Sequence, residues 1–123
     1  MTMVTMDLPA AVKNYQFGER AKSSLIMVSQ LCVALTGFKD QEKTGARRML
    51  IMMMESTRAE LQFAVHSTGH SSFQKAINSL SEAISLVESD QPDQAALKIG
   101  TAVSAATTPA QEAWQVLSEH GLL

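Results

Sequence analysis

Apolar residues recur at alternating spacings of three and four in four separate segments of this 123-residue chain. Such spacing puts one apolar side chain on the same face of an α-helix at every turn, and it does not fit the two-residue period of a strand. The third segment is the most regular, and its stripe consists of Phe73, Ile77, Leu80, Ile84 and Val87. The pattern predicts an all-α protein whose helices each bury one face.

Capping residues predict the ends of the first two helices. Asp7 is placed to cap the first helix, with Pro9 in its first turn, and Gly18 is expected to weaken it before it ends at 36–37 with Gly37 as the residue after the cap. Its stripe is Leu25, Val28, Cys32 and Leu35. The second helix is expected to start at a cap on Asp40 or Thr44 and to close at Gly69.

The third and fourth helices have their own start signals. Ser71 with Gln74 three residues later fits a capping box, and this helix is expected to end near Ser89. Asp90 is placed to cap the fourth helix, which has Pro92 in its first turn. The apolar stripe of the fourth helix is Ala96, Ile99, Val103, Ala106, Ala110, Ala113 and Leu117. This register continues across Pro109, so the helix is expected to be kinked there or split into two collinear pieces, and a kink is favoured.

Short connections between four amphipathic helices force sequential neighbours to run antiparallel. The prediction is an up-down-up-down antiparallel four-helix bundle formed by one domain, residues 1–123, with residues 1–6 frayed.

Composition excludes several classes of function. The net charge of −2 provides no general attraction to nucleic acid. The longest apolar run, Met49–Met54, has six residues, whereas a bilayer-spanning helix needs about 20. The single cysteine, Cys32, cannot form an internal disulfide, which favours a reducing, cytoplasmic location.

The second helix carries two apolar stripes on nearly opposite sides. One stripe is Leu50, Met54, Thr57, Leu61 and Ala64, and the other, called here the second stripe, is Met49, Met52, Ser56, Ala59 and Phe63. Between them runs a polar strip of Arg48, Glu55, Gln62 and His66. A helix of a monomeric bundle needs one apolar face, so the second stripe requires a cover.

Three alternatives remain for what packs against the second stripe. It is the candidate interface of a homodimer in which the second helix meets its symmetry mate. Alternatively, the N-terminal segment around Tyr15 and Phe17 overlies it, or it receives the helix of another protein, for which flexible methionines are well suited.

Candidates for chemistry are weaker. His66 and His70 are four residues apart, but Gly69 interrupts the helix that would align them on a metal, and no third ligand lies nearby. Cys32 lies on the core stripe of the first helix, and no general base is predicted beside it. The chain is therefore expected to be no enzyme and to hold no cofactor or metal. A bundle that binds a metal or small molecule is the remaining alternative.

In plan, the chain resembles the flagellin export chaperones. The resemblance rests on a short helical chain with Asn14-Tyr15-Gln16 early and Glu112-Ala113-Trp114 in the last helix. The leucine- and tyrosine-rich segments of that family are missing from the first and third helices. The resemblance implies an adaptor or chaperone that binds a client helix.

From the residues themselves, the expectation is a non-enzymatic bundle that acts through protein contacts. Its partner is expected to be a second copy of itself through the second helix, or another helical protein, with neither nucleic acid nor a membrane as a partner.

Overall fold

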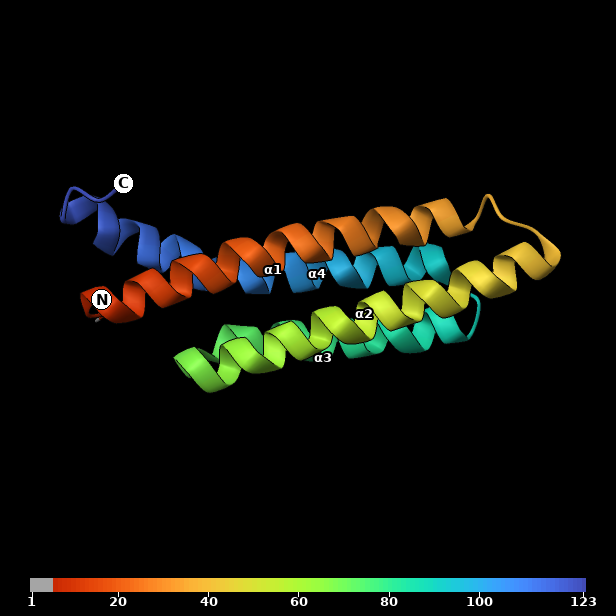
Figure 1. Cartoon of the computed structure of the whole chain (residues 1–123), viewed down its shortest axis with the longest axis horizontal. Coiled ribbons are helices and arrows are strands. Elements are labelled where there is room, and N and C mark those ends of the chain that lie inside the picture. Colours follow the sequence, from red (N-terminus) through yellow and green to blue (C-terminus); the bar gives the residue numbers. More distant parts are fainter. Residues whose placement is uncertain (1–5) are drawn as a thin grey trace.

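A computed structural model describes residues 6–123, which form four helices in an antiparallel bundle. They are α1 (Leu8–Leu35), α2 (Asp40–Thr68), α3 (Ser71–Glu88) and α4 (Pro92–Glu119). Figure 1 shows α1 lying along α4 and α2 lying along α3. The closest packing is between α1 and α4, and α1 and α2 contact each other least among the neighbouring pairs. The predicted all-α, up-down-up-down bundle is confirmed.

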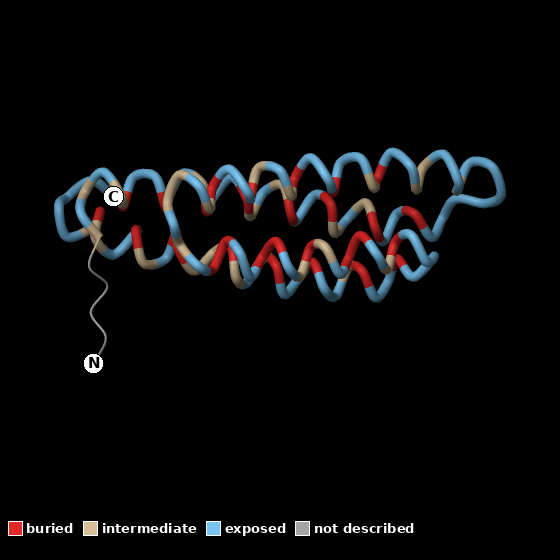
Figure 2. Tube along the Cα trace, turned by 90° about the horizontal axis from the view of Figure 1, so that it is seen from below, coloured by how far each residue is buried: buried red, intermediate tan, exposed pale blue. Residues whose placement is uncertain are grey.

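The core follows the predicted stripes closely. In Figure 2 the buried residues face the space between the helices. All stripe residues predicted for α1 and α3 are buried, and so are the five of the first stripe of α2. In α4 the register is partly wrong, because Ala95 and Ala102 are buried where Ala96 and Val103 were expected. The neighbouring alanines Ala95 and Ala96 are identical in size, so residue size does not identify the buried one.

Gly18 does not weaken α1, which runs unbroken through it. The residue is buried where α1 crosses α4, and a Cβ added there would lie 2.7 Å from the Cβ of Ala110. Hydrogen as a side chain is therefore what allows the two backbones to approach.

The helix ends differ from several predictions. Asp7 caps α1 by accepting from the Ala10 N–H at 2.8 Å, and Gly69 ends α2 with φ 69°, both as expected. However, Gly37 does not adopt a left-handed conformation, and α2 starts at Asp40 after Lys39, with no side-chain cap.

The expected caps of α3 and α4 are also wrong. His70 precedes α3, and its Nδ1 accepts from the Ser72 N–H at 3.1 Å, so the Ser71 capping box is not formed. Gln91, rather than Asp90, precedes α4. Asp90 lies in the preceding turn with φ 61° and pairs with Lys43 and Arg47 of α2.

Helix α4 is one continuous helix through Pro109, so the split is excluded. Figure 1 shows its C-terminal part turning away from the line of the rest, as a proline kink does. Residues 1–6 are predicted to be frayed. Residues 1–5 lie outside the described part of the chain, so only Met6 bears on this prediction. Met6 packs partly buried on a small second cluster of Ala11, Ala113 and Leu117.

Candidate functional site

The second stripe of α2 is exposed along its whole length. Met49 and Met52 are each 68% exposed, Phe63 is 64% exposed, and the small residues Ser56 and Ala59 are exposed between them. The first stripe of the same helix is buried. The side chains of Met49, Met52 and Phe63 therefore face outward from a helix whose opposite face is already buried in the core.

The N-terminal segment covers this face only at one end. The ring of Phe17 lies 5.9 Å from that of Phe63, centroid to centroid, with a tilt of 43°. Phe63 nevertheless stays mostly exposed. Tyr15 packs elsewhere, against the cluster of Ala11, Ala113 and Leu117. The alternative in which this segment overlies the second stripe is therefore wrong for all but Phe63.

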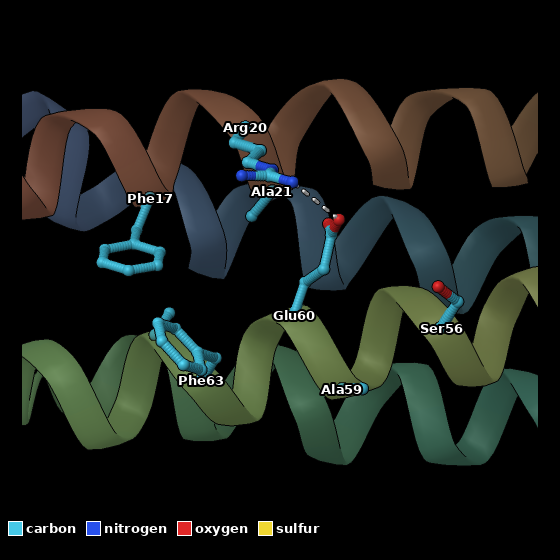
Figure 3. Close-up of a pocket in the computed structure, with 8 residues that line it drawn as sticks. Phe17, Arg20, Ala21, Ser56, Ala59, Glu60 and Phe63 are labelled. Carbon is cyan, nitrogen blue, oxygen red and sulfur yellow. Dashed lines mark ion pairs between the residues drawn. The ribbon is translucent and has the colours of Figure 1, made fainter.

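A shallow groove runs between α1 and α2 beside the second stripe. Its largest part, of about 450 Å³, lies between Phe17 and Ala21 of α1 and Ser56 and Phe63 of α2. Figure 3 shows the two phenylalanine rings facing each other across it. A second part of about 240 Å³ shares Ser56, and a third of about 230 Å³ adjoins it at Met53. The groove thus follows the weak α1–α2 seam.

Both walls of the groove carry helical spacing. On α1 the lining residues Phe17, Arg20, Ser24, Met27, Leu31 and Ala34 follow one another at intervals of three and four, and Phe38 in the connection to α2 continues the lining. On α2 the residues Met49, Met53, Ser56, Glu60 and Phe63 do the same. Such spacing is typical of faces that receive another helix.

The charges within the groove neutralise each other. Arg20 Nη2 lies 3.5 Å from Glu60 Oε1, and the Ser24 hydroxyl donates to Glu60 Oε2 at 3.2 Å. The pair crosses the groove from α1 to α2 (Figure 3). Because Arg20 and Glu60 are paired with each other, a partner that covers the groove buries no unpaired charge. Burial of an unpaired charge is the more costly case.

The chemical candidates take structural positions. Cys32 is fully buried, and burial raises the pKa of its thiol to about 11. His70 Nε2 lies 2.7 Å from Glu112 Oε2, which ties the α2–α3 turn to α4, while His66 is exposed on the polar strip. Within residues 6–123, no three His, Cys, Asp or Glu side chains are grouped to hold a metal ion. Also within that range, no helix is long and apolar enough to cross a bilayer.

Two features of the site were not predicted. The α1–α2 groove depends on how far the two helices separate, which no sequence period encodes. The link from His70 to Glu112 joins residues 42 apart in the chain, and neither residue carries a local signal for it.

Comparison of the chain with protein-family models, with curated protein sequences and with solved structures finds no match.

Proposed function

We propose that this protein acts through protein–protein contacts and that its first partner is a second copy of itself, held through the second stripe of α2. The observation that supports this is the exposure of Met49, Met52 and Phe63 on a helix whose opposite face is already buried. An apolar face of this kind is stabilised when a partner removes it from water.

The size of the exposed surface suits a stable dimer. Six large apolar side chains border the second stripe and the groove: Met27, Phe38, Met49, Met52, Met53 and Phe63. At about 200 Å² for each large side chain, their exposed fractions amount to roughly 650 Å². A standard interface buries about 800 Å² on each partner. Apolar side chains alone therefore supply most of one side of such an interface.

The chemistry of the surface suits a second copy. The Arg20–Glu60 pair is closed within each chain, so two copies can meet without bringing unpaired like charges together. Ser56 and Ala59 are small enough for close approach of two helices, and the methionines around them adapt to the remaining space.

Charge substitution with a matched control tests the proposal. In light scattering, Phe63→Glu and Met52→Glu are expected to convert a dimer into a monomer, because each places a carboxylate within the apolar contact. Leu97→Glu on α4 is the control, since Leu97 is at least as exposed, at 77%. Equal effects of all three substitutions, or no effect of the first two, would refute the second stripe as the interface.

A client helix is the alternative occupant, and the helical spacing on both walls of the groove favours it. A monomeric wild-type chain that retains a helical partner in a pull-down, and loses it with Met52→Glu, would replace the homodimer with this alternative.

A further inference from the structure

We infer that the two copies of α2 pair antiparallel, with the two-fold axis passing close to Ser56. This inference rests on the proposed homodimer and specifies its geometry. It follows from the order of side-chain sizes along the second stripe and from the difference between the two flanks of that stripe.

The second stripe is spaced nearly symmetrically about Ser56. Its members lie at −7, −4, 0, +3 and +7 residues from Ser56, so reversing the helix about Ser56 brings position 49 opposite 63 and position 52 within one residue of position 59. In this arrangement the large side chain of Met52 faces the small one of Ala59 in the partner. The two layers that flank the central pair of Ser56 residues then each contain one large and one small residue, so the filling of the contact is more even along the helices.

A parallel pair has a less even distribution. It sets Met52 against Met52 and Ala59 against Ala59, so one layer is overfilled and another is empty. Because protein interiors pack at nearly uniform density, the helices would have to splay or leave a void. The antiparallel pair also places Met49 beside the aromatic ring of Phe63 at both ends, a favourable contact of sulfur with an aromatic edge.

The flanks of the stripe distinguish the two arrangements independently. On one side lies the α1–α2 groove, with the partly exposed Met27 and Met53. On the other side lies the polar strip of Arg48, Glu55, Gln62 and His66, whose four side chains are all exposed. A two-fold axis perpendicular to the helices places like flank against like flank, whereas an axis parallel to the helices places each flank against the opposite one.

Only the antiparallel pair therefore joins apolar groove to apolar groove and leaves both polar strips in water at the rim. The two Glu55 carboxylates approach each other at this rim. Arg58 lies 4.0 Å from Glu55 within each copy and reduces their repulsion. The parallel pair would instead cover the groove methionines with the partner's polar strip, which costs the desolvation of those polar groups.

Cysteine cross-linking of the full chain tests the direction. In a Cys32→Ala background, Ser56→Cys is expected to form a disulfide-linked dimer under mild oxidation, because position 56 lies near the axis. Met49→Cys alone is expected to give no cross-link, since positions 49 of the two copies would be about 21 Å apart at 1.5 Å per residue, beyond the reach of a disulfide. An equimolar mixture of Met49→Cys and Phe63→Cys chains is expected to give the mixed dimer.

The results distinguish a failure of the antiparallel geometry from a failure of the homodimer. A cross-link at Ser56→Cys together with self-linked Met49→Cys dimers would show a parallel pair and overturn the inference while leaving the homodimer intact. No cross-link at Ser56→Cys, with a monomeric mass in light scattering, would remove the homodimer itself. Leu97→Cys on α4 serves as the control for random collision, and it should stay uncross-linked.

Discussion

Gly18 of α1 and Ala110 of α4 lie so close that a Cβ at position 18 would be 2.7 Å from the Ala110 Cβ and 3.1 Å from the Ala110 backbone nitrogen. The Ala106 carbonyl oxygen is 3.2 Å from the same point. Two of these three neighbours are backbone atoms, so α4 cannot make room by turning a side chain. This crossing fixes the separation of the most extensively packed pair of helices, α1 and α4.

Gly18→Ala is expected to destabilise the protein by up to about 2 kcal/mol, because overpacking typically costs about 1–3 kcal/mol and the gain in helix propensity offsets only about 1 kcal/mol of this. Urea unfolding measures the difference. Gly100→Ala is the control, since nothing lies within 4 Å of a Cβ there, and it is expected to stabilise by up to about 1 kcal/mol. Equal stabilisation by both substitutions would contradict the close crossing.

Cys32 is expected to be unreactive in the folded protein. It is fully buried, and the raised pKa of its thiol leaves little of the nucleophilic thiolate at neutral pH. A thiol reagent such as a disulfide dye should label it only at the rate of unfolding. The chain with Cys32→Ala and Val33→Cys, whose new thiol is at an exposed position, should react at once. Rapid labelling of native Cys32 would contradict its burial.

Asp90 is expected to contribute to stability in a pH-dependent way. Its hydrogen bond to Lys43, 3.0 Å away, and the nearby charge of Arg47 hold the pKa of Asp90 below its ordinary value. A carboxyl whose pKa is lower in the folded state stabilises the protein above its unfolded pKa, and this contribution is lost as the pH falls through the folded value.

Asp90→Asn tests this contribution, because asparagine tolerates the left-handed φ of 61° but carries no charge. The wild type should be the more stable at neutral pH, and the difference should shrink below about pH 4. The control is Glu88→Gln, at a carboxylate that forms no ion pair within residues 6–123, and it should show no such trend. An Asp90→Asn difference that is constant with pH would count against the pairing.

Methionine oxidation should report the exposure of the second stripe. Hydrogen peroxide transfers an oxygen atom to an accessible thioether, so in dilute protein Met49 and Met52 should oxidise well before the fully buried Met54. Mass spectrometry of peptides measures each rate. Raising the protein concentration should slow Met49 and Met52 selectively, because a dimer shields them. Equal rates for Met52 and Met54 would contradict the two-sided α2.

The sequence predicted those parts of the fold that a helical period with bulky residues defines. Leu50, Met54 and Leu61 of α2 are large enough to mark the buried row, so both stripes were placed correctly. In α4 the buried Ala95 and Ala102 are small, and their neighbours Ala96 and Val103 are equally apolar or bulkier, so residue size did not mark the buried row and the register was partly wrong.

Capping residues were predicted less well, because several polar residues compete at each turn. Asp90, for example, pairs with Lys43 instead of capping α4. Glycine has a low helix propensity, so Gly18 is predicted to weaken α1. Its packing against Ala110 depends on the crossing of two distant segments, which the local sequence does not encode. The α1–α2 groove was missed for the same reason.

The molar mass of the wild-type chain in solution tests the central claim most directly. Light scattering over a series of micromolar concentrations is expected to give twice the chain mass of 13.3 kDa, decreasing toward the monomer on dilution. A mass that stays at 13.3 kDa throughout would contradict self-association through the exposed face of α2.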